Sequence, residues 1–319
     1  MKPQVLVIVG PTAVGKSKVA LELARRLGGE IVSADSMQVY QGMDIGTAKP
    51  SRLERRKVTH HLLDIIPPSR SFSVFSYQKR AFAKIRKILR RGKFPIVVGG
   101  SGLYVRSLVE GLSPEPGPDK KLRRKLFQAA EKSGSAKLHG RLLRLDPERA
   151  RKIKPGDTKR IVRALEIFER SGKKPSEWHS QKKESLETQG FEPFVVGLTK
   201  DRQRLYADIE KRVDAMFQKG LVREVKKLLK GRLSQTAAQA VGYKELFAAL
   251  RGSGTLEEAR NAIKKKSRHL AKRQMTWFRK EKGIQWVIWE EGDTVKGICE
   301  KIQHVIARRH PNKAEAICF

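Results

Sequence analysis

The chain has 319 residues, 69 of them Lys or Arg and 33 Asp or Glu, and a formal net charge of +36 at pH 7. Its length suffices for a buried core, and the basic excess indicates a polyanionic partner, most simply nucleic acid. The two cysteines, Cys299 and Cys318, lie near the C-terminus without metal spacing, which excludes a disulfide scaffold and a zinc site. No signal peptide and no apolar run of ~18 residues is found, so we expect a cytoplasmic protein without membrane contact.

The first motif is a glycine-rich loop between a strand and a helix. The apolar run 5–9 predicts a buried strand, and Val19, Leu23 and Leu27 fall on one face of a predicted helix over 17–27. Between them the phosphate-binding pattern G-x-x-x-x-G-K-S/T is complete. It comprises Gly10, Pro11, Thr12, Ala13, Val14, Gly15, Lys16 and Ser17.

This pattern predicts a site for phosphate groups. The glycines let backbone N–H groups converge on a phosphate, and the helix N-terminus adds partial positive charge. The side chain of Lys16 can reach the outer phosphate oxygens, and the hydroxyl of Ser17 can hold a magnesium ion. Read alone, the loop indicates ATP or GTP binding.

An aspartate follows the second predicted strand. Residues 30–34 form that strand, which ends at Asp35. Since the carboxyl ends of parallel strands meet at one edge of a sheet, we expect Asp35 beside the phosphate loop. An aspartate there can accept a proton or orient a nucleophile. A turn or helix-cap aspartate is an equally good interpretation.

The next segment contains a glycine-punctuated loop, Gly42–Pro50, and a histidine pair. His60 and His61 precede a predicted strand over 62–66. The pair is compatible with metal or acid–base chemistry, or with loop histidines packed on the core. Residues 75–90 predict an amphipathic helix with Phe75 on its apolar face.

The strand predicted over 94–98 ends in glycines, Gly99-Gly100-Ser101-Gly102. In P-loop ATPases such a strand often ends in the aspartate that helps hold magnesium. Glycines permit close approach of a ligand or form a tight turn. This strand end therefore disfavours ordinary NTP hydrolysis and favours a large substrate close to the backbone.

The character of the chain changes after the proline-rich segment 113–118. Short basic helices follow, and Asp157 is a candidate cap for the helix that carries Lys159, Arg160 and Arg163. Strand character returns at 194–198. We therefore expect a parallel α/β core in two parts, 1–118 and 191–319, with a helical insertion at 119–190.

The C-terminal part contains further binding candidates. A helix predicted over 201–217 carries Arg212 off its apolar stripe. Residues 239–244 form a short loop in which Tyr243 suits stacking on RNA bases. The very basic helix predicted over 256–282 suits contact with phosphates, and the tail beyond Arg308 is expected to fray.

These residues resemble the tRNA dimethylallyltransferases, the isopentenyl transferases that prenylate an anticodon-loop adenosine. The similarity runs from Val5 to Trp289. It rests on the segments Gly10–Ser17, Asp35–Ser36, Gly42–Pro50, His60 with Leu62–Asp64, Gly99–Tyr104, Val241–Tyr243, Lys272–Gln274 and Thr276–Trp277. The resemblance implies a P-loop nucleotide-kinase-like core with an inserted helical domain.

The resemblance also implies an activity and its residues. Family members transfer the dimethylallyl group from dimethylallyl diphosphate to N6 of adenosine 37, with Mg²⁺. By this resemblance the loop holds diphosphate, Lys16, Ser17 and Arg212 act on it, Ser17 holds the metal, and Asp35 is the general base. The implied tRNA-binding residues are Asp35, Ser36, Met37, Gln38, Ser101, Arg123, Lys159, Arg160, Ile161, Val162, Arg163, Gln239, Ala240, Val241, Gly242, Tyr243 and Lys244.

We accordingly expect a monomeric transferase that binds the anticodon stem-loop of tRNA and dimethylallyl diphosphate. Three alternatives share part of the pattern. A P-loop kinase of a small molecule explains the loop but not the charge. An adenylate isopentenyltransferase acting on free AMP shares the chemistry, and a non-catalytic RNA-binding P-loop protein explains the charge but not Asp35.

Overall fold

The computed structural model describes residues 2–181 and 183–309. Its chain forms two compact units, one of Met1–Val109 with Leu186–Phe319 and one of Glu110–Ser185. The second unit therefore begins and ends some residues before the insertion expected at 119–190. The tail beyond 309, for which fraying was expected, lies outside the described residues.

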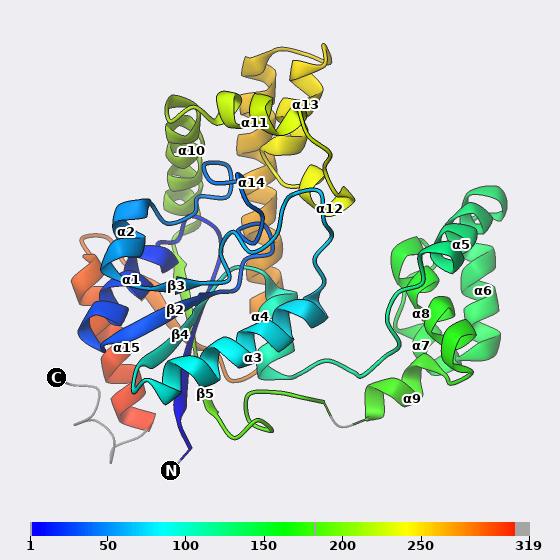
Figure 1. Cartoon of the computed structure of the whole chain (residues 1–319), viewed down its shortest axis with the longest axis horizontal. Helices are drawn as coiled ribbons and strands as arrows, with labels where there is room; N and C mark the ends of the chain where they lie inside the picture. Colours follow the sequence, from blue (N-terminus) through cyan, green and yellow to red (C-terminus); the bar gives the residue numbers. More distant parts are fainter. Residues whose placement is uncertain (1, 182, 310–319) are drawn as a thin grey trace. The chain divides into compact units, whose positions relative to one another are not determined.

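The larger unit contains, within the described residues, a six-stranded sheet in the order β3-β2-β4-β1-β5-β6 (Figure 1). All its neighbouring strands are parallel, and Ile8 stands opposite both Val98 and Val196. The strands are β1 (Gln4–Val9), β2 (Gly29–Ser33), β3 (His60–His61), β4 (Phe94–Val98), β5 (Glu192–Lys200) and β6 (Gln285–Trp289). The parallel α/β core expected from the sequence is confirmed.

The prediction of a strand over 62–66 is wrong. The segment 62–66 leaves the sheet after His61, because Leu62 and Asp64 have left-handed backbone angles, with φ of 63° and 55°. Such angles do not fit a strand.

Helices cover both faces of the sheet, which is why its strands are apolar on both sides. On one face α1 (Lys16–Arg26) and α15 (Val295–Arg309) share a buried cluster with Leu6 and Ile8. On the other, α3 (Val74–Arg90) and α4 (Gly102–Val109) share a cluster with Val5 and Val7. In α3 the expected apolar face is shifted, since Phe75 is 59% exposed and Tyr77 is buried instead.

A third apolar cluster joins helices that follow β5. They are α10 (Arg202–Gln218), α11 (Leu221–Leu229), α12 (Gln235–Ala238), α13 (Tyr243–Leu250) and α14 (Leu256–Phe278). The short α2 (Arg52–Lys57) lies between the glycine-punctuated loop and β3. Leu205, Ile209 and Val213 are buried at four-residue spacing, as the sequence predicted for α10. No described helix is both long and apolar enough to cross a membrane.

Among the described residues, the smaller unit consists of helices and loops, with one isolated β-bridge between Leu112 and Glu184. Its helices are α5 (Lys120–Ser133), α6 (Ser135–Leu145), α7 (Pro147–Arg151), α8 (Thr158–Ser171) and α9 (Pro175–Ser180). Leu126, Leu142 and Leu165 belong to its apolar core. The expected cap is confirmed, since the side chain of Asp157 accepts a hydrogen bond from the backbone N–H of Arg160 at 3.2 Å.

A buried carboxylate holds two arginines in this unit. The side chain of Glu166 is 0% exposed and accepts hydrogen bonds from Arg123 at 2.6 Å and Arg163 at 2.8 Å. A third bond comes from the backbone N–H of Asp119. Burial alone would raise the pKa of Glu166, but these hydrogen bonds outweigh it and hold the pKa below its usual value.

We predict that Glu166→Ala destabilises the helical unit by about 1–3 kcal/mol, because Arg123, Arg163 and the N–H of Asp119 lose the acceptor that they share. Arg163 keeps its contacts with Glu115 and the carbonyl oxygen of Pro116. The measurement is urea-induced unfolding of the full chain, with amide hydrogen exchange to localise the loss to α5 and α8. Glu169→Ala is the control, because Glu169 pairs with Arg141 at the surface and should change stability by less than about 1 kcal/mol. Equal effects of the two variants would contradict this interpretation.

Candidate active site

The phosphate loop joins β1 to α1 in the geometry that the pattern predicts. A Cβ on Gly10 would lie 2.4 Å from the carbonyl oxygen of Leu198, and one on Gly15 would lie 2.5 Å from the ring of Trp289. Only glycine fits at these two positions. Among the described residues, no side chain caps the N-terminus of α1 at Gly15, so its first N–H groups remain available to an anion.

Lys16 lies inside this loop. Its Nζ donates hydrogen bonds to the carbonyl oxygens of Gly10 at 2.9 Å and Pro11 at 2.7 Å. Burial, and then the nearby charge of Arg212, lowers the pKa of Lys16 to about 7, against a smaller opposing effect of Asp35. The ammonium group therefore lies where an added anion would stabilise its charge.

The structure brings Arg212 to the same loop from α10. Its guanidinium donates a hydrogen bond to Oγ1 of Thr12 at 3.2 Å. Burial lowers the pKa of Arg212 as well, and Asp35 opposes this shift. Two buried cations thus face one carboxylate, and this excess of positive charge suits a phosphate-bearing ligand.

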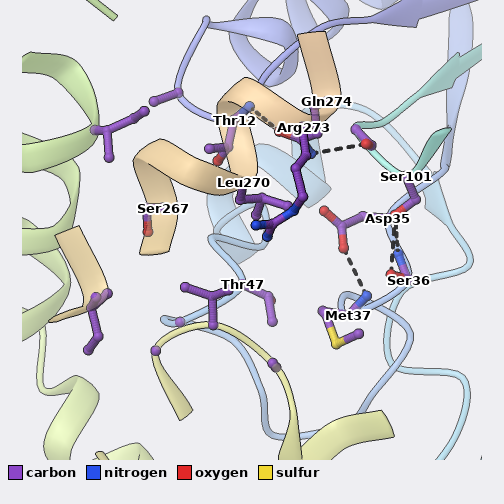
Figure 2. A pocket seen from close by; sticks show the side chains of 18 of the residues that line it. Thr12, Asp35, Ser36, Met37, Thr47, Ser101, Ser267, Leu270, Arg273 and Gln274 are labelled. Atoms are coloured by element: carbon purple, nitrogen blue, oxygen red, sulfur yellow. Dashed lines mark hydrogen bonds between the residues drawn. The ribbon is translucent and has the colours of Figure 1, made fainter. Parts of the chain in front are cut away.

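Asp35 follows β2 and faces the loop, as the sequence predicted. Its Oδ1 accepts a hydrogen bond from the backbone N–H of Met37 at 2.8 Å (Figure 2). Its Oδ2 has no hydrogen bond to another described residue, and the side chain lines the cavity. The turn interpretation is therefore confirmed for Oδ1, and the position of Oδ2 is compatible with a proton acceptor.

The glycines after β4 bring strand ends together. A Cβ on Gly99 would lie 2.1 Å from the carbonyl oxygen of Ala34, so the space that Gly99 leaves is filled by the end of β2. Ser101 adds to this contact, because its Oγ accepts a hydrogen bond from the N–H of Ser36 at 2.9 Å. The sequence indicated that a ligand could approach these glycines closely. At Gly99, the group that approaches is the backbone of Ala34.

A cavity of about 580 Å³ opens at these strand ends (Figure 2). Its polar end contains Thr12, Asp35 and Arg212. Part of its apolar lining belongs to the third cluster, namely Met37, Val213, Met216, Leu221, Ala240 and Ile263. A smaller compartment of about 100 Å³ shares Thr12, Asp35 and Arg212 and adds Lys16 and Ser17.

The two compartments therefore share polar side chains, among them Thr12, Asp35 and Arg212. The smaller one has the cations and hydroxyl that suit a diphosphate, and the larger one has the apolar walls that suit a prenyl group or a base. Such an arrangement can bring a group bound at the loop into contact with a group that Asp35 deprotonates.

The two histidines of the pair have different surroundings. His61 bonds to Glu30 at 2.6 Å and belongs to the structural frame. His60 lines the smaller compartment, and its Nδ1 is bonded to the carbonyl oxygen of Val58 at 2.8 Å. Burial lowers the pKa of His60, which favours its neutral form.

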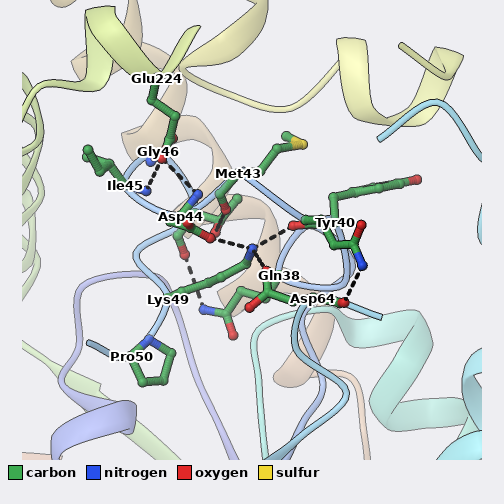
Figure 3. Close-up of polar contacts among 12 residues, drawn as sticks. Gln38, Tyr40, Met43, Asp44, Ile45, Gly46, Lys49, Pro50, Asp64 and Glu224 are labelled. Atoms are coloured by element: carbon green, nitrogen blue, oxygen red, sulfur yellow. Dashed lines mark hydrogen bonds and ion pairs between the residues drawn. The ribbon is translucent and has the colours of Figure 1, made fainter. Parts of the chain in front are cut away.

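The glycine-punctuated loop forms one wall of the cavity through Gly46 and Thr47. Glu224 on α11 holds it, since this carboxylate accepts hydrogen bonds from the N–H groups of Asp44, Ile45 and Gly46 (Figure 3).

Two further side chains support this wall. The side chain of Lys49 is 1% exposed, and its ammonium bonds Asp44 at 2.7 Å, Asp64 and the carbonyl oxygen of Tyr40 (Figure 3). Gln38 donates to the carbonyl oxygen of Thr47 at 3.2 Å. No local sequence pattern indicated the Glu224 contact, because the loop and α11 are far apart in the chain.

The loop 239–244 differs from expectation at Tyr243. Its ring is 0% exposed, and its hydroxyl donates to Glu224 at 2.6 Å. A Cβ on Gly46 would lie 2.5 Å from this ring. Stacking of Tyr243 on RNA bases is therefore wrong for this structure, and the residue supports the cavity wall instead. Gln239 and Lys244 are exposed, and Gln239 lines the cavity together with Ala240, Val241 and Gly242.

The candidate residues of the helical unit are only partly accessible. Lys159 and Arg160 are exposed at the start of α8. Ile161 and Val162 are buried in the core of this unit, so their side chains do not reach an RNA surface. The guanidinium groups of Arg123 and Arg163 are held by Glu166, at the half-buried edge of the unit.

Helix α14 contributes cavity residues that belong to the segments of the family resemblance but for which the sequence predicted no role in the site. Arg273, Gln274 and Trp277 line the larger cavity. The exposed residues Lys265, Lys266 and Lys272 lie on the same helix. The sequence showed the motif Lys272–Gln274 with Thr276–Trp277, but it did not show the contact of Gln274 with the phosphate loop.

Known proteins of one family are similar to this chain. The family model described as IPP transferase matches residues 38–281. A tRNA dimethylallyltransferase of Desulforudis audaxviator is 48% identical over 91% of this chain and 93% of its own length. One of Pelotomaculum thermopropionicum is 45% identical over 96% of each chain.

Solved structures extend the comparison. The full-length tRNA isopentenylpyrophosphate transferase of Bacillus halodurans has a TM-score of 0.72 and 41% identity, covering 98% of this chain and 99% of its own. A eukaryotic dimethylallyltransferase described as acting on tRNA has a TM-score of 0.82 and 29% identity, covering 98% of this chain and 80% of its own. With a phosphate loop, an aspartate at the end of β2 and this similarity along nearly its whole length, the chain belongs to the IPP transferase family.

Proposed function

We propose that the protein transfers the dimethylallyl group of dimethylallyl diphosphate to N6 of adenosine 37 in the anticodon loop of tRNAs. The products are N6-(dimethylallyl)adenosine and diphosphate. The observation that carries this proposal is the meeting of the two compartments at Thr12, Asp35 and Arg212. The names of the relatives, tRNA dimethylallyltransferases, support it.

On the donor side, the loop stabilises the leaving group. As the bond between the allylic carbon and the diphosphate oxygen breaks, the oxygen gains negative charge. The N–H groups of the loop, Lys16 and Arg212 lie around the compartment in which this charge develops. Preorganised donors of this kind lower the barrier because they need no rearrangement during the reaction.

Magnesium fits this compartment. Mg²⁺ prefers hard oxygen ligands, keeps several waters and commonly binds through substrate phosphates. Ser17 and Asp35 provide oxygen atoms there, and no group of three or more His, Cys, Asp or Glu among the described residues forms a separate metal site. We propose that Ser17 holds the ion together with the diphosphate. When bound, magnesium neutralises part of the phosphate charge.

On the acceptor side, Asp35 is proposed as the general base. The N6 amine is a poor nucleophile because its lone pair is delocalised into the adenine ring. Loss of its proton to the free Oδ2 of Asp35 while the N6–carbon bond forms would accelerate the reaction by roughly 10²–10⁴-fold. The base must leave its stack to reach the cavity, as in other enzymes that modify bases.

Basic side chains suit the tRNA backbone in each unit. In the larger unit, Lys265, Lys266, Lys272 and Arg273 are exposed on α14, and Arg273 also lines the cavity. In the helical unit, Lys159 and Arg160 are exposed. We propose that both sets contact phosphates of the anticodon stem-loop.

A small-molecule kinase is not favoured. It would not require the apolar lining of the larger cavity or the basic surfaces. An adenylate isopentenyltransferase shares the donor chemistry, but free AMP gives no reason for the exposed cations of α14.

We predict that the purified protein, with Mg²⁺, dimethylallyl diphosphate and unmodified tRNA, forms N6-(dimethylallyl)adenosine at position 37. Nucleoside mass spectrometry of the digested tRNA detects this product. AMP added in excess should compete weakly with tRNA. Formation of ADP from ATP without prenylated RNA would contradict the proposal, and efficient prenylation of AMP would favour the adenylate alternative.

We predict that Asp35→Asn binds tRNA normally but loses about 10²–10⁴-fold in single-turnover rate, because the amide cannot accept the proton. The asparagine Oδ1 can still accept the bond from the N–H of Met37, so the turn should survive. Asp208→Asn is the control, because Asp208 on α10 pairs with Lys200 at the end of β5. An unchanged single-turnover rate in Asp35→Asn would remove Asp35 from the base role.

We predict that binding of dimethylallyl diphosphate takes up a proton at Lys16. The pKa of about 7 in the free protein means that Lys16 becomes neutral above this pH, whereas the bound diphosphate favours the charged form. The affinity of wild-type protein relative to Lys16→Met should therefore fall as pH rises from 7 to 9, by up to about tenfold per unit.

Calorimetry in buffers of different ionisation enthalpy measures this uptake directly, and the ratio to Lys16→Met cancels the titration of the ligand itself. Lys18→Met, at an exposed neighbouring position, should retain the wild-type profile. A pH-independent ratio would show that Lys16 does not change protonation on binding.

A further inference from the structure

The side chain of Gln274 lies between two edges of the cavity. Its Oε1 accepts a hydrogen bond from the backbone N–H of Thr12 at 2.8 Å, and its Nε2 donates one to the carbonyl oxygen of Gly100 at 3.0 Å (Figure 2). Both ends of the amide are used, one as an acceptor and one as a donor. A carboxylate or an apolar side chain of similar size cannot make this pair of bonds.

The fit around this amide is close. A Cβ on Gly100 would lie 2.4 Å from Nε2 of Gln274, so only glycine at this position allows the contact. Gln274 also lines both the larger cavity and the smaller compartment. The glycine at the end of β4 that sequence analysis assigned to a ligand thus accommodates a protein side chain.

This bridge belongs to a longer series of hydrogen bonds. On the donor side, Thr12 also accepts a bond from Arg212 at 3.2 Å. On the acceptor side, Gly100 precedes Ser101, whose Oγ accepts the N–H of Ser36, next to Asp35. Gln274 is the side chain that connects these two halves across the cavity.

We propose that Gln274 is a positioning residue that fixes the separation between the diphosphate held at Thr12 and Arg212 and the base Asp35. The inference rests on the proposed function and assigns no contact between Gln274 and the reacting atoms. It acts through the backbone of Thr12 and of Gly100, each of which it holds by one hydrogen bond.

The separation of donor and acceptor matters because reacting atoms must lie about 3–3.5 Å apart for productive attack, and a displacement of about 1 Å can cost 10²-fold in rate. Without the bridge, the phosphate loop still has its glycines, Lys16 and Arg212 to bind diphosphate. Loss of Gln274 should therefore lower kcat more than it weakens donor binding.

The first test is Gln274→Met, which keeps the length of the side chain but removes both hydrogen bonds. We expect kcat for tRNA prenylation to fall on the order of 10- to 100-fold, with a change in KM for dimethylallyl diphosphate of less than about threefold. Amide hydrogen exchange of the peptide containing Thr12 should become faster. Gln218→Met makes the same replacement at an exposed position of α10 and should leave activity and exchange unchanged.

The second test is Gln274→Glu, which gives a pH signature that a purely structural role would not give. The carboxylate can still accept from Thr12, but its second oxygen repels the carbonyl oxygen of Gly100 until it is protonated. Burial and this carbonyl group should raise its pKa, whereas the cations Lys16 and Arg212 of the same compartment oppose this shift. The activity of Gln274→Glu relative to wild type should therefore rise as pH falls from 8 to 6.

Three results would overturn the inference: an unchanged kcat in Gln274→Met, a loss confined to KM, or a pH-independent ratio for Gln274→Glu. Circular dichroism and thermal unfolding of each variant identify a simple loss of folding. If wild-type protein forms no prenylated tRNA, the proposed function fails. Faster exchange at Thr12 in Gln274→Met would then still support the bridge between loop and strand end.

Discussion

The structure depends on an excess of positive charge buried at the phosphate loop. Lys16 and Arg212 face the single carboxylate of Asp35, and burial lowers the pKa of both cations. A folded chain can tolerate such a site only if the cations are solvated by carbonyl and hydroxyl oxygens, as Lys16 is by Gly10 and Pro11. The site is therefore complementary to an anion, and Asp35 remains close enough to act on a neighbouring group.

The glycine-punctuated loop shows how polar contacts shape the same cavity. Glu224 receives three backbone N–H groups and the hydroxyl of Tyr243, while Lys49 is almost fully buried among its acceptors. Such networks are costly unless every member is satisfied, and a satisfied network specifies one conformation. The network connects the loop to α11 and α13, and it gives Gly46 and Thr47 a fixed place in the wall.

Local patterns predicted the parallel core, the phosphate loop and Asp35, because each depends on neighbouring residues and on the strand ends. They could not predict Gln274 or Glu224, whose partners lie 262 and about 180 residues away in sequence. The residue type of Tyr243 led to a wrong prediction of base stacking. A tyrosine ring suits either stacking on a base or burial, and here it is buried against Gly46. The sequence did not indicate that the sheet ends after His61. Leucine rarely adopts a left-handed backbone, as Leu62 does here.

The residues and the cavity beside the phosphate loop indicate which reaction the loop supports. In a kinase, the phosphoryl group at the loop is transferred, so the acceptor must reach phosphorus, and a strand-end aspartate often helps hold the metal. Here β4 ends at Gly99 and Gly100, and Gln274 occupies the space between that strand end and the loop. The larger cavity opens beside the loop with apolar walls and Asp35 at its polar end. This geometry suits reaction at a carbon attached to the phosphate, for which the group held by the loop is the leaving group.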